Sequence, residues 1–384
     1  MKKRIVIGTA LISLAGYASF PPDAVLSAFP RLAGEHDDAP RFRRAIAAAP
    51  NGVLAVGKGD YSIATPLVIT NRCSLEMHPA ARLIATAPME FVLTWDGHDD
   101  YHALSIFNPD GSIYDNAGLF IRGGDIDGRG LASCLRIGNA HHFTLANITL
   151  HNGRKAGLEL SRWNGGHLYE LIANNVYCKC TMKGLAGNIG VLVQVHDCHF
   201  TDIIVVDYTI GIRATGSSNR FTRCHVWGGT VAPKGMSMRE WSDFYAANKK
   251  QRSRWNADLE AALLSKGLPE MLAGSICFDS SSGNLFDGCY ADTGEIGFNL
   301  PHGGQLVNCG FYNNLLMGLR KSTVIVHKSG RLVITGCKFN GVTGVEKLYE
   351  GPWKDVVWSS STASGGADMD ADATKLRHGT PVQK

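Results

Sequence analysis

A short sequence motif, which we call the recurring phrase, repeats along this chain. It consists of a small residue followed by an apolar–any–apolar triplet, and then, twelve to fourteen residues after the small residue, a position expected to be buried, which we call the answering position. The phrases begin at Cys134, Gly157, Gly190, Gly211, Ser275, Gly297 and, imperfectly, Gly318. The answering positions are Ile148, Leu171, Ile203, Cys224, Cys289, Cys309 and Cys337, the last of which follows Gly318 by 19 residues and so departs from the spacing. A repeat of about 20 to 25 residues is typical of coils that bury their apolar faces only by stacking on one another. The phrase therefore predicts a single-domain β-solenoid.

The composition narrows the class of protein. A formal charge of +4 with 19% charged residues, and no basic stripe, argues against a nucleic-acid partner. Forty-four glycines and 14 prolines suit many short strands joined by tight turns. No stretch of the sequence is long and apolar enough to predict a membrane span.

Residues 1–18 have the pattern of a secretory signal peptide. Met1 to Arg4 are basic, an apolar run extends to Gly16, and Ala18 offers a small residue for cleavage. This interpretation predicts a secreted or periplasmic protein. The alternative is that the stretch forms a buried N-terminal strand.

The cysteines favour packing over cross-linking. Cys224, Cys289, Cys309 and Cys337 fall at the same inward point of their coils, and free cysteine is easily buried. Cys178 and Cys180 have the wrong spacing for a zinc pair, although a disulfide that involves either one remains an alternative. We predict no metal site.

The segment Asp37-Asp38-Ala39-Pro40 predicts the start of a helix that extends to about Ala49. A strand pattern follows from Gly52. A helix in this position would cover the open apolar end of a solenoid.

Two segments carry a resemblance to a known superfamily. The run from Gly34 through Asn51-Gly52-Val53 to Ile63, and the sequence GGDIDGRG at Gly123–Gly130, resemble parts of pectin-lyase-like right-handed parallel β-helices. Polysaccharide lyases, family 28-type glycosidases and phage tailspikes share this fold. The resemblance implies an all-β, right-handed, single-stranded parallel β-helix over residues 34–345, with an N-terminal capping helix. A tailspike would place the protein in a phage virion, which is the alternative location.

The resemblance does not transfer a catalytic mechanism. Family 28-type glycosidases carry an N-x-D, an Asp-Asp pair and a G-H-G on the coils after the G-G-x-I-D-G segment, and this chain lacks them there. No C-terminal trimerisation module is evident either, although homo-oligomerisation stays possible.

Two segments depart from the repeat. Residues 230–274 contain a capping box at Ser237–Glu240 and apolar residues at helical spacing, which predicts a helical insertion. The insertion is either a lid or a structural cover. Residues 346–384 lose the regularity, and we expect a C-terminal extension that is partly disordered.

Strand alternation predicts which residues point outward. Three residues past the answering positions, the outward row reads His151, Asn174, Val206, Trp227, Asp292, Tyr312 and Asn340. Tyr290, Asp207, Glu295 and Asn314 lie close to it in sequence. A second outward row, inside the triplets, reads Arg136, Glu159, Leu192, Arg213, Cys277, Asn299 and Arg320.

Carboxylates among aromatic rings suit a carbohydrate polymer or oligosaccharide, and a pair of acids can cleave a glycosidic bond. The candidate catalytic residues are Asp292, Asp207, Glu295 and, as a proton carrier, His151. The candidate substrate-binding residues are Trp227, Tyr312, Tyr290, Asn314, Arg213, Glu159 and Arg320. We predict a glycosidase that needs no cofactor.

Two alternatives remain. A polysaccharide lyase or epimerase would use Arg213 or Arg320 to bind a carboxylate, with calcium as a possible cofactor of the lyase. A non-catalytic phage-tail or surface protein would bind glycan through the same aromatic residues.

Overall fold

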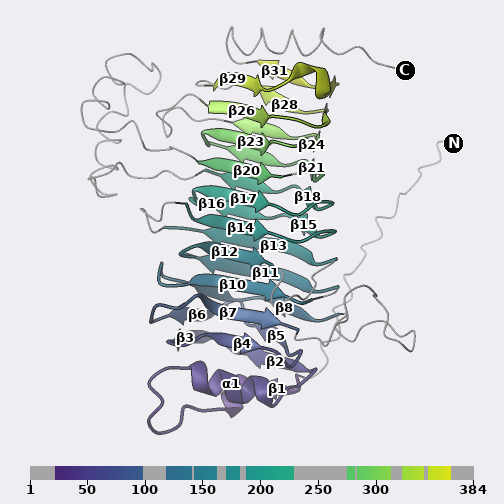
Figure 1. Ribbon diagram of the computed structural model, residues 1–384. Helices are drawn as coiled ribbons and strands as arrows, with labels where there is room; N and C mark the ends of the chain where they lie inside the picture. The colour runs from purple at the N-terminus through teal and green to yellow at the C-terminus, as the bar shows by residue number, and fades with distance from the viewer. Residues whose placement is uncertain are drawn as a thin grey trace, which may run out of the picture.

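The computed structural model describes residues 22–97, 118–140, 142–161, 170–181, 187–228, 275–281, 283–312, 322–340 and 345–364. Their strands form an elongated stack of coils, and the chain advances from one end of the stack to the other (Figure 1). Neighbouring coils pair in parallel. The predicted parallel β-helix is confirmed.

Each complete coil contributes strands to three faces, which we number in chain order. Face 1 comprises β1 (Ala24–Val25), β2 (Val53–Val56), β5 (Ser74–Met77), β8 (Phe120–Arg122), β15 (His199–Thr201), β18 (Arg220–Thr222), β21 (Leu285–Asp287), β24 (Gly304–Val307), β27 (Leu332–Thr335) and β30 (Val356–Ser359). Face 2 comprises β3 (Gly59–Ile63), β6 (Ala81–Ala85), β9 (Asp125–Asp127), β16 (Ile204–Val206), β19 (His225–Trp227), β22 (Tyr290–Asp292), β25 (Gly310–Tyr312), β28 (Lys338–Asn340) and β31 (Thr362–Ser364).

Two long strands, β11 (Thr144–His151) and β13 (Ile172–Lys179), extend across faces 1 and 2. Face 3 comprises β4 (Leu67–Ile69), β7 (Phe91–Asp96), β10 (Ser133–Gly138), β12 (Ala156–Leu160), β14 (Ile189–Val193), β17 (Ile210–Ala214), β20 (Ile276–Ser280), β23 (Ile296–Leu300), β26 (Ser322–His327) and β29 (Val345–Glu350). The described residues also form two short 3-10 helices, η1 (Leu26–Ala28) and η3 (Trp353–Asp355).

The core is a set of side-chain stacks that follow the long axis. Phe200, Phe221 and Phe286 stack with ring centroids 4.7 and 5.0 Å apart, and all three are buried. Each buried phenylalanine contributes about 1.5–3 kcal/mol by leaving water. The same spacing repeats because parallel coils lie about 4.8 Å apart.

All ten cysteines are buried and free. Cys224, Cys289, Cys309 and Cys337 occupy equivalent inward positions, as predicted, and the Sγ atom of each lies within hydrogen-bonding distance of backbone carbonyls. The alternative of a disulfide that involves Cys178 or Cys180 is wrong.

One helix closes the first end of the stack. α1 (Ala39–Ala47) lies below β2 and β4 in Figure 1 and buries Phe42, Ala45 and Ile46 against the first coil. Asp37 accepts a 2.6 Å hydrogen bond from the Ala39 N–H, while Asp38 binds Arg31 and the Ser62 N–H instead. The predicted capping helix is confirmed.

The small residue of the recurring phrase has a steric cause. A Cβ on Gly157, Gly190 or Gly211 would lie 2.6–2.7 Å from a carbonyl oxygen of the next coil. Cys277, and not Ser275, takes this position after β17, because Ile212 pairs with Phe278 and Arg213 with Asp279. Cys277 is therefore buried, and its predicted outward position is wrong.

The β-helix is longer than predicted. β30 pairs with β27 and β31 with β28, so the coils continue to Ser364 and not to residue 345. Ser359–Ser361 misled the sequence interpretation, because the inward Val356 and Trp358 alone carry the apolar signal of this coil. At the other end, β1 pairs with β2 ahead of the predicted start at residue 34.

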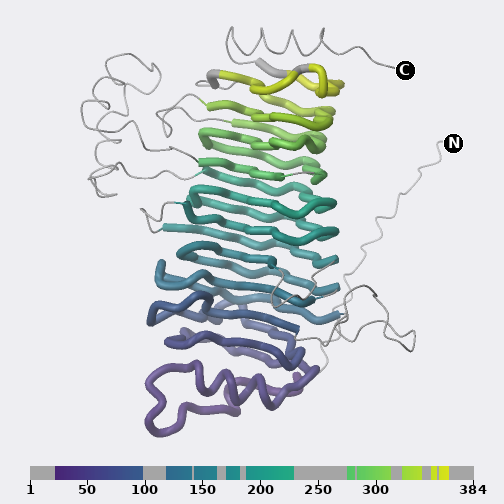
Figure 2. Tube along the Cα trace, viewed as in Figure 1, coloured from purple at the N-terminus to yellow at the C-terminus, as the bar shows by residue number. Residues whose placement is uncertain are grey.

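Several predictions fall outside the described residues: the signal peptide at 1–18, the helical insertion at 230–274, and residues 365–384 of the C-terminal extension. Within the described ranges, no helix is long and apolar enough to cross a bilayer. The path of the chain is drawn as a tube in Figure 2.

Candidate functional site

Two outward rows follow face 2 from coil to coil. Strand pairing places Asp60, Arg82, Asp125, Thr149, Tyr177, Ile204, His225, Tyr290 and Gly310 in the first row. The second row contains Ser62, Ile84, Asp127, His151, Lys179, Val206, Trp227, Asp292 and Tyr312. The second row is the predicted one with a single correction.

The correction concerns Asn174, which lies on face 1 between Ala146 and Thr201. The buried residue that matches Ile148 and Ile203 is Val176, not Leu171, so Lys179 takes the place predicted for Asn174. The error arose because β13 extends across faces 1 and 2 and has inward apolar residues on each of them, so that two registers fit the sequence. Asn340 ends β28, the strand that pairs with β25.

The upper part of face 2 brings aromatic rings and a carboxylate together. Trp227, Asp292 and Tyr312 are direct partners on three successive coils, and Tyr290 lies beside them in the first row. Trp227 is 37% exposed and Tyr312 is 41% exposed. We call these four residues the aromatic wall.

Neighbouring groups fix the Asp292 carboxylate. Its Oδ1 accepts a 2.6 Å hydrogen bond from the Thr293 hydroxyl, and its Oδ2 lies 3.8 Å from His225 Nε2. The His225 ring lies 5.1 Å from that of Tyr290. Burial, with the charge of Asp292 as a smaller cause, raises the pKa of Tyr290 to about 12, so this phenol stays a neutral donor.

Two predicted acids lie at the edge of the wall. Asp207 directly follows β16 with a φ of 63°, and its N–H donates to the Trp227 carbonyl at 3.1 Å. It matches Thr293 in register two coils away, a separation of about 10 Å along the axis. Glu295 directly precedes β23, where its N–H donates to the Ser275 hydroxyl at 3.0 Å.

His151 lies apart from the aromatic wall. Four coil steps separate it from Asp292 in the second row, which is about 19 Å. Its Nδ1 lies 3.0 Å from Asp125 Oδ2. His151 is therefore too far from Asp292 for the two side chains to act together in proton transfer at one glycosidic bond.

His151 belongs instead to a charged group on the lower coils, which sequence reasoning missed. This β9 cluster contains Asp60, Arg82, Asp125, Asp127 and His151. Arg82 lies 3.5–3.6 Å from carboxylate oxygens of all three aspartates. The signal was present, since Asp125 and Asp127 flank the inward Ile126 and so share the outward side of one strand.

The β9 cluster is held rigidly. Asp127 Oδ1 accepts hydrogen bonds from the Arg129 N–H at 2.9 Å and from Asn152 Nδ2 at 3.1 Å. Asp125 Oδ1 is buried without a hydrogen-bond partner among the described residues. Across the described ranges, histidines, cysteines and acids form no group of three or more arranged to hold a metal ion.

The second predicted row lies on face 3, a different face of the β-helix from the aromatic wall. Arg136 binds Glu159 at 3.1 Å, and Arg213 Nε donates to Asp279 at 2.7 Å. Asn299 also donates to Asp279, at 2.8 Å. Glu159 and Arg213 are thus occupied by cross-strand pairs. Asn314 and Arg320 lie outside the described residues, and the place in the row predicted for Arg320 is wrong, because Val326 is the partner of Asn299.

The connections from face 2 to face 3 differ greatly in length. Residues 207–209 join β16 to β17, whereas residues 228–275 join β19 to β20 and residues 313–321 join β25 to β26. The two long connections begin directly after Trp227 and Tyr312. Binding residues concentrate in the connecting segments beside a rigid scaffold, which favours this edge of face 2.

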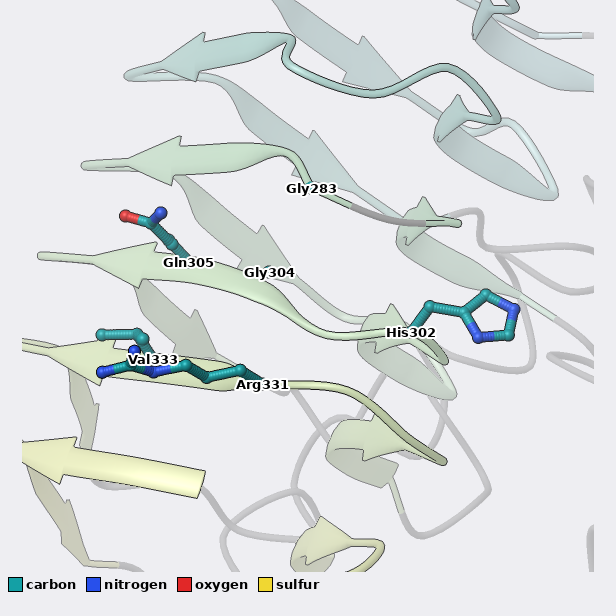
Figure 3. Close-up of a pocket in the computed structure, with 6 residues that line it drawn as sticks. All are labelled: Gly283, His302, Gly304, Gln305, Arg331 and Val333. Atoms are coloured by element: carbon teal, nitrogen blue, oxygen red, sulfur yellow. The ribbon is translucent and has the colours of Figure 1, made fainter. Parts of the chain in front are cut away.

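A separate cavity of about 430 Å³ lies on face 1, across β24 and β27. Figure 3 shows Gln305 on β24 and Val333 on β27, with Arg331 directly before β27 and His302 at the turn that precedes β24. Gly283 and Gly304 complete the lining. None of the predicted site residues lines this cavity.

Solved structures share this architecture. An endo-xylogalacturonan hydrolase from Aspergillus tubingensis matches 90% of the chain and 97% of its own length, with 11% identity and a TM-score of 0.53. The chain has the pectin-lyase-like right-handed parallel β-helix fold. The ORF18 protein of Geobacillus virus E2 matches 89% of the chain with 13% identity and a TM-score of 0.52.

Tailspike protein 2 of bacteriophage CBA120, solved as its enzymatically active domain, has the same pectin-lyase-like fold, with 10% identity and a TM-score of 0.53. It matches 87% of the chain. The chain spans 59% of the Geobacillus virus protein and 43% of this tailspike chain. No protein-family model and no curated protein sequence matches.

Proposed function

We propose that this protein binds a carbohydrate polymer or oligosaccharide on the aromatic wall of face 2 and hydrolyses one of its glycosidic bonds beside Asp292. The observation that carries the proposal is the order Trp227, Asp292, Tyr312 on successive coils. A sugar chain that stacks on both rings crosses the carboxylate between them. Rings of this kind bind the apolar faces of sugars, and a carboxylate supplies proton transfer.

Asp292 is the proposed proton donor to the leaving oxygen. Asp207 is the proposed base that activates water, since it directly follows β16 at the same edge of face 2, two coils from Asp292. Glu295 is the second candidate for this role. Hydrolysis is the first choice over elimination because Arg213, one of the two arginines to which elimination would be assigned, is paired with Asp279, while the other, Arg320, lies outside the described residues.

The names of the structural neighbours support a carbohydrate ligand, since they include a xylogalacturonan hydrolase and an enzymatically active tailspike domain. The same names support a secreted or phage-associated protein. A non-catalytic glycan binder is the second candidate, because the exposure of Trp227 and Tyr312 suits binding without chemistry.

The test is a panel of soluble glycans that includes xylogalacturonan and bacterial surface polysaccharides. Each is assayed for new reducing ends, for absorbance near 235 nm, and for binding. We expect reducing ends without the absorbance. Both signals together would indicate a lyase, binding alone would indicate a non-catalytic protein, and no binding to any glycan would contradict the proposal.

A further inference from the structure

The two outward rows of face 2 are continuous between the aromatic wall and the β9 cluster. Lys179 and Val206 lie between His151 and Trp227 in the second row, and Tyr177 and Ile204 lie beside them in the first. Ile204 is 38% exposed. The surface between the two groups is therefore mostly apolar, with the ammonium group of Lys179 at its side. A sugar chain can lie on such a surface.

Asp125, on the preceding coil, fixes the orientation of the His151 ring. Its Nδ1 faces the Asp125 carboxylate at 3.0 Å, and its side chain is 27% exposed. A carboxylate on one ring nitrogen sets the tautomer and leaves Nε2 as the second hydrogen-bonding atom. Lys179 follows His151 in the same row. Together these residues present hydrogen-bonding groups at a fixed distance from Asp292.

We infer that His151, positioned by Asp125, is a distal sugar-binding residue, and that the substrate is a chain long enough to reach it from Asp292. This inference rests on the proposed function of the aromatic wall. It assigns His151 to recognition instead of proton transfer. The required span is about 19 Å, the four coil steps between the two residues, so a mono- or disaccharide satisfies only one of the two contact points.

The test compares fragment length with mutation. Size-fractionated fragments are prepared from xylogalacturonan and from the panel polymer that binds most tightly, and the affinity of each fraction is measured by calorimetry. For the wild-type protein, we expect affinity to rise once fragments exceed about 19 Å. His151→Ala should lower the affinity for long fragments about tenfold and leave short fragments within about twofold.

Asp125→Asn tests the positioning role and should give a smaller loss, again on long fragments only. His151→Gln, which keeps a hydrogen-bonding group, should recover part of the lost affinity. Gln305→Ala on face 1 is the matched surface control and should change neither fraction. Thermal unfolding of each variant shows whether it is folded.

Equal affinity of His151→Ala and wild type for long fragments would overturn the inference, and so would an equal loss on short and long fragments. Trp227→Ala separates this outcome from failure of the proposed function. If the aromatic wall is the binding surface, this variant weakens both fractions. If Trp227→Ala weakens neither fraction, the proposed function itself is wrong.

Discussion

Trp227 and Asp292 are direct partners on neighbouring coils, although the whole of residues 228–275 lies between their strands in the sequence. The coil register is therefore the same before and after residues 228–275. Backbone pairing holds the proposed binding residue and the proposed reacting residue side by side.

Replacement of Asp292 by asparagine keeps the shape of the side chain and removes its titratable proton. We expect cleavage to fall by at least about a hundredfold, the usual contribution of general acid–base catalysis, while glycan affinity changes little. Reducing-end assays and calorimetry on the same protein measure both effects. A variant that keeps its full rate would rule out Asp292 as the proton donor.

Trp227→Ala should weaken glycan binding about tenfold or more, because an exposed ring that anchors a ligand contributes roughly 2 kcal/mol. Val357→Ala is the control, since Val357 is a similarly exposed apolar residue on β30 of face 1. Calorimetry with the tightest-binding polymer provides the comparison. Equal losses in both variants would indicate that binding is not confined to face 2.

Gly211→Ala tests the steric cause of the recurring phrase. The added Cβ would lie 2.6 Å from the Cys277 carbonyl and against Val226, and overpacking of this kind costs about 1–3 kcal/mol of unfolding free energy. Gly57→Ala meets no atom within 4 Å and should change stability little. Denaturant unfolding of the two variants decides the point, and equal stabilities would refute the explanation.

Asp38 should make the capping helix sensitive to acid. Burial opposes its charge, yet the hydrogen bonds from Arg31 and the Ser62 N–H hold the pKa of Asp38 below its ordinary value. A carboxylate whose pKa is depressed in the folded state stabilises it above the unfolded pKa of about 3.9, and that contribution is lost as pH falls further.

The corresponding experiment compares the wild type with Asp38→Asn. At neutral pH we expect the variant to lose about 2–3 kcal/mol of unfolding free energy, because the charged partners are left unpaired. The difference between the two proteins should shrink as the pH is lowered below about 4. A difference that stays constant with pH would show that the charge of Asp38 contributes nothing.

The thiols should be inert in the folded protein. All ten cysteines are buried, and burial raises the pKa of Cys73 to about 11 and that of Cys277 to about 12, so these groups remain protonated. Ellman's reagent should react slowly with the native protein and count ten thiols in denaturant. Fast reaction of the native protein would contradict the burial of these side chains.

Much of the fold could be predicted from the sequence because several coils repeat the same steric demand. The glycines of the phrase, the stacked cysteines and the outward positions of Trp227, Asp292 and Tyr312 all follow from one register. The predictions failed where that register is ambiguous. Leu171, directly before β13, and Val176 within it are both buried, and Cys277 replaces a glycine.

The candidate site was harder to predict because alternation gives the face of a residue but not its partners. Arg213 and Glu159 were grouped with the aromatic residues in sequence reasoning, yet they lie on face 3 in ion pairs. The β9 cluster was missed because Arg82, Asp125 and His151 are distant in sequence and meet only through pairing of β6, β9 and β11.

Because each coil rises by the same distance, equivalent residues on face 2 are spaced at intervals of about 4.8 Å. Removal or duplication of one coil between Lys179 and Trp227 would change the distance between His151 and Asp292 by about 4.8 Å. The contacts within the β9 cluster and within the aromatic wall would stay the same. In this architecture, the distance between the two groups, and with it the proposed length of the ligand, can change by whole coil steps without redesign of either group.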